Sequence, residues 1–387
     1  SYLRDYLNIS DFDVLVAEAK PQQQHWSLPK RCVQNALLFR KIAQKASLEN
    51  SLSIIPYIST GHIWNLGRCV FEETSKPIAI AAPPPRLAKH INDKVWFSYW
   101  VEAALGQDAL TPAYVVYGPS TLAGYVKRLA HETERLVIKI PDSAGSIGNL
   151  SLEAASFRGQ SLQQIKNQLL EMLDSLGWSG TFPLKIEIWE TPTLSSPSAQ
   201  IWIPRPENGL PIIEGIFEQV VEGSIGKFVG AVKSQMPDAV REQMVEQAMS
   251  LAFLFQRLGY FGRCSLDALL IGNEYENATL HWIECNGRWG GVSIPMTFFN
   301  RIVPDPNDYE IMIVQKFDLS LPERPFAEAV KALDGLLFHH EKVDEGLVML
   351  TPTSFEHGCG LHFMTIAKSL GKARKLASHA IERLTNV

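Results

Sequence analysis

Three polar side chains recur at every second residue at the end of an apolar run. Glu284, Asn286 and Arg288 lie in the stretch HWIECNGRWGG (281–291). Alternate residues of a β-strand share one face, so Glu284 and Asn286 point the same way, and Arg288 joins them if the strand persists. A carboxylate, an amide oxygen and a guanidinium on one face could bind a divalent cation and a phosphate group.

A further carboxylate, Asp267, lies in the preceding strand-like run CSLDALLI (264–271). If Ile271 pairs with Leu280 in a hairpin, Asp267 falls opposite Glu284. Two like charges directly opposed in a sheet repel each other, and a hard cation such as Mg²⁺ would relieve that repulsion. The alternative is a solvated polar face on which Arg288 pairs with Glu284, and the spacing alone does not decide between the two.

A lysine near the end of another apolar strand suits phosphate binding. Lys139 lies in LVIKIP and is followed by PDSAGSIG, in which Gly145 and Gly148 allow the backbone to turn its N–H groups toward an anion. This is no Walker A loop, because the lysine precedes the glycines and no GK[ST] follows. Taken alone, a loop rich in serine and glycine is more often a simple turn.

The run KIEIWE (185–190) is a strand with acids at Glu187 and Glu190 and an aromatic ring at Trp189. Such a segment could hold an adenine through backbone hydrogen bonds and apolar stacking. Its simpler interpretation is an edge strand with exposed acids, and that is favoured when the segment is considered alone.

The elements that must position these residues follow from periodicity and turn residues. The N-terminal part alternates strands and helices, which indicates an α/β layer, and its helix over 92–105 begins with Asn92 as N-cap. A small α+β unit spans about 120–190. The expected strands are 12–19, 51–58, 76–86, 111–119, 134–140, 183–190, 199–204, 211–221, 226–232, 264–271, 279–286, 346–352 and 361–369. The expected helices are 31–46, 92–105, 120–130, 161–177, 241–260 and 370–384.

Composition excludes several classes of protein. The chain has 387 residues, 46% of them hydrophobic, enough for a large core divided into two or three units. Its formal net charge is −5 and it has no basic block, so neither nucleic acid nor a membrane is an expected partner. Its five cysteines are scattered without a CxxC pair, which favours a reducing, cytoplasmic location. No secretory signal and no apolar run of membrane-spanning length is recognisable.

In their order along the chain these pieces resemble the ATP-grasp superfamily. The matching segments are NDK (92–94), LVIKIPDSAGSIGN (136–149), LKIEIWE (184–190), CSLDALLI (264–271) and IECNGRWGG (283–291). They supply the lysine-bearing strand, the glycine-rich lid loop, the hinge strand with an acid, and the acid followed by E-x-N-x-R. SPSAQIWIP (196–204) and the layout look most like the subgroup of amino-acid and peptide ligases that includes the pheganomycin peptide ligase.

The resemblance implies a role for each matching residue. Arg288 would be catalytic and stabilise the transferred phosphoryl group, and Asp267, Glu284 and Asn286 would hold one or two Mg²⁺ ions, with Mn²⁺ as a substitute. The hinge acids would bind the adenine amino group or the ribose. The implied ATP-binding residues are Lys94, Lys139, Ser143, Gly145, Ser146, Gly148, Glu187, Ile188, Trp189 and Glu190.

The resemblance also implies a fold and a reaction. The fold would be mixed α/β and α+β, with an N-terminal pre-ATP-grasp domain (1–118), a small lid subdomain (119–195) and a catalytic subdomain with a C-terminal extension (196–387). The reaction would activate a carboxylate as an acyl phosphate with ATP and couple it to an amine, such as an amino acid or a peptide, releasing ADP and phosphate. The alternatives are a small-molecule kinase of the same fold and a non-catalytic nucleotide-binding regulator. Both substrates would be small molecules, and a homodimer would be compatible with this class.

Overall fold

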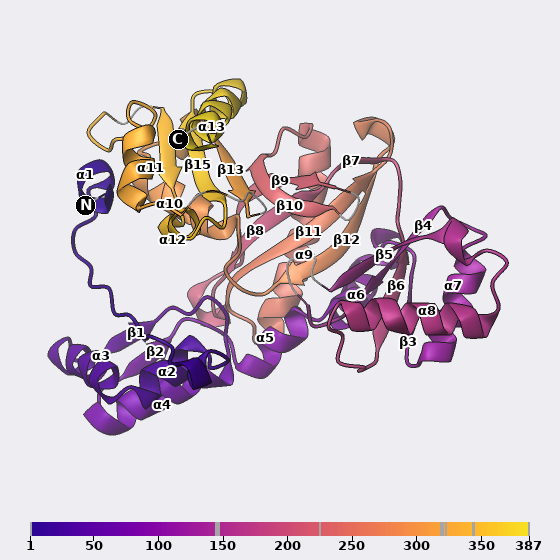
Figure 1. Ribbon diagram of the computed structural model, residues 1–387, viewed down its shortest axis with the longest axis horizontal. Helices are drawn as coiled ribbons and strands as arrows, with labels where there is room; N and C mark the ends of the chain where they lie inside the picture. Colours follow the sequence, from indigo (N-terminus) through magenta and orange to yellow (C-terminus); the bar gives the residue numbers. More distant parts are fainter. Residues whose placement is uncertain are drawn as a thin grey trace.

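Three units surround a central crossing point in this computed structural model, which describes residues 2–143, 148–223, 226–317, 321, 323–342 and 345–385. An N-terminal domain lies at the lower left of Figure 1, a small lid at the right, and a large body across the top and centre. The lid and the body meet where α6 lies, and the candidate site lies there.

The N-terminal domain is a two-stranded parallel sheet covered by helices. Its β1 and β2 pair from Leu52↔Ile78 to Ile54↔Ile80, and α3 and α4 bury Ala46, Leu66 and Val70 against them. The elements of this part of the chain are α1 (Tyr2–Leu7), η1 (Pro21–Gln23), α2 (Leu28–Gln34), α3 (Ala36–Leu48), β1 (Leu52–Ile54), α4 (Gly61–Thr74), β2 (Ile78–Ile80) and α5 (Pro85–Ile91).

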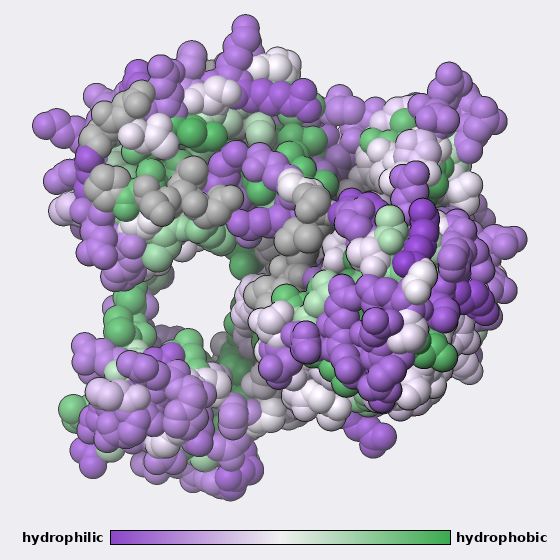
Figure 2. Space-filling view, turned by 45° about the vertical axis from the view of Figure 1, so that its right-hand side comes forward, coloured by the Kyte–Doolittle hydropathy of each residue, from purple (hydrophilic) through white to green (hydrophobic). Residues whose placement is uncertain are grey.

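The expected strand over 12–19 is wrong. That segment has no strand assignment, and the Val14 and Val16 side chains are 73% and 69% exposed. It follows α1, which lies on the body, and leads to the N-terminal domain, so it crosses between two units (Figure 1). β-branched residues favour strands only where a neighbouring strand and a packed face are available. Figure 2 shows the opening that separates these two units beside the connecting segment.

The helix α6 (Lys94–Leu105) begins one residue later than expected and joins the lid to the body. Its N-cap is Asp93, whose carboxylate accepts hydrogen bonds from Val95 N at 2.8 Å and Trp96 N at 3.0 Å. Asn92, the expected cap, is free for another contact described below. Gly106 ends the helix as expected, with φ of 91°. The turn η2 (Gln107–Ala109) follows.

The lid is a four-stranded antiparallel sheet with two helices on one face. The strand order is β3-β6-β4-β5, and α7 and α8 bury that face with side chains such as Ile138, Ile165 and Ile186. The opposite face carries Lys139, Lys185 and Glu187. The lid elements are β3 (Ala113–Val116), α7 (Pro119–Leu129), β4 (Arg135–Lys139), β5 (Asn149–Glu153), η3 (Ala154–Phe157), α8 (Leu162–Ser175) and β6 (Leu184–Ile188).

The body is built on a large antiparallel sheet of order β12-β11-β8-β9-β10-β13-β15-β14, with β7 beside β11. Its first half consists of β7 (Thr193–Ser195), β8 (Pro197–Ile203), η4 (Pro206–Asn208), β9 (Ile212–Glu222), β10 (Lys227–Lys233), α9 (Asp238–Arg257), β11 (Gly262–Ile271), η5 (Tyr275–Asn277) and β12 (Thr279–Asn286). The second half consists of α10 (Ser293–Ile302), η6 (Pro306–Asp308), β13 (Glu310–Lys316), α11 (Phe326–Ala332), β14 (Gly346–Met349), α12 (Pro352–Glu356), β15 (Leu361–Ala367) and α13 (Leu370–Thr385).

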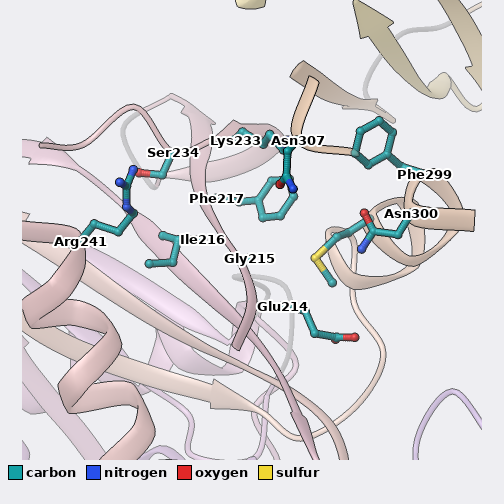
Figure 3. Close-up of a pocket in the computed structure, with 11 residues that line it drawn as sticks. Glu214, Gly215, Ile216, Phe217, Lys233, Ser234, Arg241, Phe299, Asn300 and Asn307 are labelled. Carbon is teal, nitrogen blue, oxygen red and sulfur yellow. The ribbon is translucent and has the colours of Figure 1, made fainter. Parts of the chain in front are cut away.

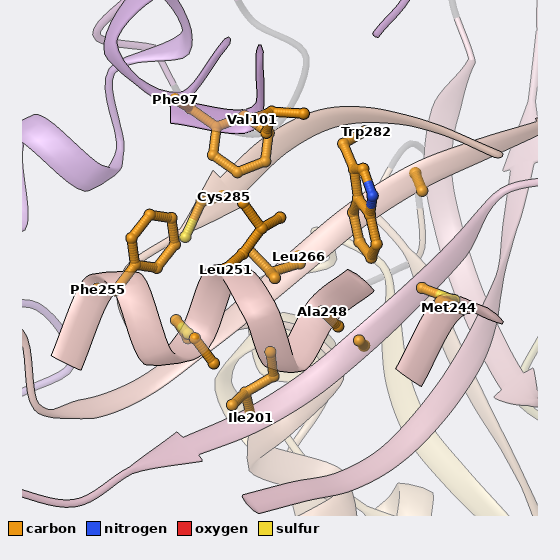
Figure 4. Close-up of a cluster of buried hydrophobic side chains, with 14 of the residues drawn as sticks. Phe97, Val101, Ile201, Met244, Ala248, Leu251, Phe255, Leu266, Trp282 and Cys285 are labelled. Carbon is orange, nitrogen blue, oxygen red and sulfur yellow. The ribbon is translucent and has the colours of Figure 1, made fainter. Parts of the chain in front are cut away.

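One part of the core of the body lies between this sheet and α9. Phe97 of α6 packs with Phe255 of α9 and with Trp282 of β12 in one buried cluster (Figure 4). Apolar residues of β8, β11 and β12 therefore face α9, and the alternate residues of these strands, Asp267 among them, face the other side of the sheet. Within the described ranges, every helix is too short or too polar for a bilayer span.

Candidate functional site

Two carboxylates face each other on the polar face of the body sheet. Asp267 of β11 pairs in register with Glu284 of β12, and Ser265 pairs with Asn286. The predicted opposition of Asp267 and Glu284 is therefore confirmed, although the register at the hairpin end differs, because Ile271 pairs with Thr279. A β-bulge at Ile283 restores the predicted pairing.

Asp267 is held from both sides. Its Oδ1 accepts a hydrogen bond from Ser198 Oγ at 2.5 Å, and its Oδ2 accepts one from Asn286 Nδ2 at 2.9 Å. The same amide group lies 3.5 Å from Glu284 Oε1. Asp267 is 6% exposed, whereas the Glu284 side chain is 31% exposed, so the two carboxylates and the amide form a compact cluster that is buried at Asp267 and open to solvent at Glu284.

The electrostatics of this cluster fit a divalent cation. Burial, and next the charge of Glu284, raise the pKa of Asp267 to about 7, against the opposing effect of the Ser198 hydrogen bond. A cation between the carboxylates would remove that repulsion, and Mg²⁺ prefers few carboxylates with water and phosphate as further ligands. The described residues contain no group of three or more His, Cys, Asp or Glu arranged for a metal, so this cluster offers two carboxylates and an amide.

Lys94 connects the cluster to the lid. Its Nζ donates to Ser143 O at 2.8 Å and to Ser143 Oγ at 3.2 Å, and it lies 3.5 Å from Glu284 Oε2. Burial lowers the pKa of Lys94, while the charge of Glu284 opposes that shift. The first helical residue of α6 thus contacts the lid loop and the body carboxylate at once.

The lid loop is anchored at both ends. Ile140 N donates to Gly148 O at 2.9 Å, and Ser143 Oγ donates to Ile140 O at 2.7 Å. A Cβ at Gly148 would overlap the Ser143 side chain, so this position requires glycine. The predicted lid residues Gly145 and Ser146 lie outside the described residues.

The face of the lid sheet that is not covered by α7 and α8 carries a buried group of three charged side chains. Glu187 forms ion pairs with Lys139 and with Lys185, whose Nζ lies 2.6 Å from Glu187 Oε1. Lys185 Nζ also donates to Ser98 Oγ of α6 at 2.6 Å. Burial opposes ionisation of Glu187, but the two lysines prevail and lower its pKa to about 2. Lys185 was not among the predicted site residues, although its i−2 position relative to Glu187 places both on one face.

The hinge after β6 is held by hydrogen bonds. The N–H groups of Ile188 and Trp189 donate to Pro112 O at 3.1 Å and to Arg135 O at 3.0 Å. Glu190 Oε2 lies 2.7 Å from His281 Nδ1 of β12. A cavity of about 700 Å³, bordered by Lys185 and His281, adjoins this hinge.

Arg288 is oriented by the residue that was expected to cap α6. Asn92 Oδ1 accepts from Arg288 Nη1 at 2.6 Å and from Gly287 N at 3.1 Å, while Asn92 Nδ2 donates to Ala88 O at 2.6 Å. The guanidinium is therefore fixed at the end of β12, next to Asn286.

A second charged group, which the sequence did not single out, lies further along the same sheet face. Arg263 is two alternations before Asp267 on β11 and forms a bidentate pair with Glu214 of β9, with Nη2 3.0 Å from Oε1. Its guanidinium lies 4.7 Å from the centre of the Trp289 ring and 5.9 Å from that of Trp202. Burial lowers the pKa of Arg263.

Glu214 also borders a cavity of about 230 Å³ beside α10. Figure 3 shows Glu214 on one side of this cavity and Asn300 of α10 on another, with Asn307 and Phe217 across it. Lys233 lies at its wall and donates to Pro306 O and Tyr309 O at 2.8 and 2.7 Å. The cavity thus combines an apolar wall with groups of both charges.

Comparison by sequence finds no relatives: no protein-family model matches the chain, and no curated protein matches it. Comparison by structure finds proteins with a similar fold. A β-γ-ATP complex of biotin carboxylase from Campylobacter jejuni is 13% identical with a TM-score of 0.58, covering 91% of this chain and 79% of that one. The N5-carboxyaminoimidazole ribonucleotide synthetase of Thermus thermophilus is 15% identical with a TM-score of 0.55, covering 91% and 86%.

A third structure, N5-carboxyaminoimidazole synthase from Aspergillus clavatus with ADP and 5-aminoimidazole ribonucleotide, is 13% identical with a TM-score of 0.54 and covers 85% of each chain. These enzymes have the ATP-grasp architecture, and this chain has the same fold. At these identities the likeness concerns the fold alone.

Proposed function

We propose that this protein is an ATP- and Mg²⁺-dependent ligase that activates a carboxylate as an acyl phosphate and couples it to an amine, releasing ADP and phosphate. One observation carries the proposal. Lys94 contacts Ser143 of the lid loop and lies 3.5 Å from Glu284 of the carboxylate cluster. Groups suited to phosphate and groups suited to a metal therefore meet at the junction of lid and body.

The residues divide the work between binding and charge stabilisation. Lys94 and Lys139 would bind the phosphates of ATP, and Arg288, fixed by Asn92, would stabilise the phosphoryl group during transfer. Asp267, Glu284 and Asn286 would hold Mg²⁺, which when bound neutralises phosphate charge. Both nucleophiles, the carboxylate and the amine, belong to the substrates. The protein therefore needs to position the reactants and supply positive charge, and it needs no nucleophilic side chain.

The substrates belong to the finer part of the proposal. The cavity beside α10 is bordered by Glu214, whose carboxylate is paired with Arg263, and by Lys233, whose ammonium group donates to two backbone carbonyls. An ammonium group of a substrate would share the Glu214 carboxylate with Arg263, and a carboxylate would bind on the side where Lys233 lies. A small zwitterion such as an amino acid would complement that arrangement. We further propose that the acceptor amine belongs to a peptide, as in the peptide-ligase subgroup. A cytoplasmic location and a homodimer are also part of the proposal.

The test is an ADP-release assay on pairs of carboxylates and amines, with the mass of the product measured. We expect ADP and an amide in equal amounts. Glu284→Ala and Asn286→Ala should reduce turnover at least ~10³-fold while the melting temperature stays close to that of the wild type, because both side chains hold charge that the reaction needs. Lys139→Ala should mainly weaken ATP binding, measured by calorimetry.

Other outcomes would select other functions. A stable phosphorylated product without an amide identifies a small-molecule kinase. ATP binding without ADP release for any substrate pair identifies a nucleotide-binding regulator. Normal turnover by pure Glu284→Ala would exclude the metal assignment.

A further inference from the structure

The buried group of Lys139, Lys185 and Glu187 has two positive charges and one negative charge, so its net charge is positive. Glu187 and Lys185 are each 2% exposed, and Lys139 is 8% exposed. One lysine would neutralise the carboxylate. Keeping a second buried cation without a counter-ion is unfavourable, so the group has room for one further anion.

The two lysines are not equivalent. Lys185 is fixed on two sides, by Glu187 at 2.6 Å and by Ser98 Oγ at 2.6 Å. For Lys139, on the neighbouring strand β4, the structure gives a single ion pair, with Glu187. Its side chain is also the more exposed of the two, 10% against 3%. Lys139 is therefore the lysine that can exchange partners, whereas Lys185 is the fixed one.

We propose that Lys185 is a positioning residue that releases Lys139 for the nucleotide: Lys139 leaves Glu187 to bind a phosphate, and Lys185 remains as the counter-ion of Glu187. This inference rests on the proposed function, because it takes Lys139 as a phosphate ligand. Without Lys185, every Lys139 that turned to a phosphate would leave a buried carboxylate unpaired, and that is among the costliest electrostatic changes in a protein interior.

The charge distribution nearby supports this exchange. Burial lowers the pKa of Lys185, the charge of Glu187 opposes that shift, and the positive charge of Lys139 adds to it. When Lys139 turns to a phosphate, the repulsion that it exerts on Lys185 decreases, and the Lys185–Glu187 pair becomes stronger. The anchor on Ser98 keeps Lys185 near Glu187 throughout, because Ser98 belongs to α6, whose Phe97 and Val101 lie in the body core.

The test measures binding of Mg²⁺ with the non-hydrolysable β,γ-imido analogue of ATP by calorimetry, together with the melting temperature of each nucleotide-free variant. Lys185→Met should weaken binding about 100-fold, while the nucleotide-free protein stays folded because Lys139 still neutralises Glu187. The double variant Lys185→Met with Glu187→Gln should bind as tightly as Glu187→Gln alone, because no buried carboxylate then holds Lys139 back. Lys127→Met, an exposed lysine of α7 in the same lid, is the matched control and should bind like the wild type.

Each outcome of this test either supports the role of Lys185 or overturns it. A merely structural Lys185 predicts a lower melting temperature and no rescue in the double variant, which would overturn the inference. If Lys185→Met does not fold, Ser98→Ala replaces it: we expect about tenfold weaker binding, again rescued by Glu187→Gln, and unchanged binding would overturn the inference. Failure of the wild type to bind the analogue would overturn the proposed function as well, whereas normal binding by Lys185→Met overturns this inference alone.

Discussion

At the scale of single residues, the pair of Asp267 and Glu284 shows what strand spacing can and cannot predict. The shared face of Glu284 and Asn286 follows from alternation alone. Their opposition to Asp267 also depends on the bulge at Ile283, because the hairpin begins with Ile271 opposite Thr279. Without the bulge, the one-residue shift in register would turn Glu284 to the other face of the sheet. No local sequence pattern predicts this bulge.

The buried Asp267 predicts an unusual dependence of stability on pH. Its pKa is about 7 in the folded protein and 3.8 when unperturbed. A carboxyl whose pKa is raised by folding stabilises the fold when protonated, below about pH 4, and this contribution is lost as the pH rises through about 7. We expect the melting temperature of the metal-free protein to fall more steeply over that range than that of Asp267→Asn.

Addition of Mg²⁺ should reverse this loss above about pH 7 in the wild type and have little effect in Asp267→Asn, because the cation binds the ionised carboxylate. Parallel pH profiles of the two metal-free proteins would show that Asp267 titrates normally.

At the scale of elements, sequence periodicity predicts the long amphipathic helices and the alternating strands. The spans of α8, α9 and α13 and of β8, β9 and β11 agree with expectation within a few residues. Residues 293–302 and 310–316 had no prediction, and they form α10 and β13. Short apolar runs of this kind fit a buried helix or a buried strand equally well, so only tertiary packing decides between them.

The junction between α5 and the end of β12 is a packing contact that can be tested. A Cβ at Gly287 would lie 2.8 Å from Ile91 Cγ2 and 3.1 Å from Asn92 Nδ2. We expect Gly287→Ala to lower the free energy of unfolding by about 1–3 kcal/mol, since the tightly packed neighbours must shift. Turnover should fall too, because Asn92 orients Arg288. Chemical denaturation and the ADP-release assay measure both.

Gly290→Ala is the control for this substitution. The nearest atom to a Cβ at Gly290 is Ser293 Oγ at 4.0 Å, so this variant should resemble the wild type. Equal stability of the two variants would show that Ile91 and Asn92 can shift to accommodate a methyl group at little cost in free energy.

At the scale of the whole molecule, contacts between distant parts of the chain decide the arrangement, and sequence patterns do not predict them. Lys185 of the lid meets Ser98 of α6, 87 residues earlier, and Tyr2 accepts a hydrogen bond from Met349 N at 3.0 Å, 347 residues later. The ring of Tyr2 also packs edge-on to Phe326 at 5.5 Å between centres. The first helix therefore belongs to the body, although the domain that follows it in sequence does not.

We expect Tyr2→Ala to destabilise the body by roughly 1–3 kcal/mol, because it removes a partly buried aromatic ring and a hydrogen bond. Nucleotide affinity should change little, since the ring contacts Phe326 of α11 and Met349 of β14, on the side of the body away from the lid (Figure 1). Thermal unfolding and calorimetry measure the two effects, with Tyr117→Ala, an exposed tyrosine at 74%, as control. A lower nucleotide affinity in Tyr2→Ala would show that α1 is coupled to the site.

The attachment of α1 to the body has a consequence for the order of the chain. The N-terminal domain is an insertion with two connections to the body, and both chain ends lie on the same side of the molecule (Figure 1). None of the hydrophobic clusters of the described residues includes a residue from 10–31. Cleavage of the chain within 10–16 should therefore leave both units folded, with the N-terminal domain joined to the rest of the molecule by its second connection alone.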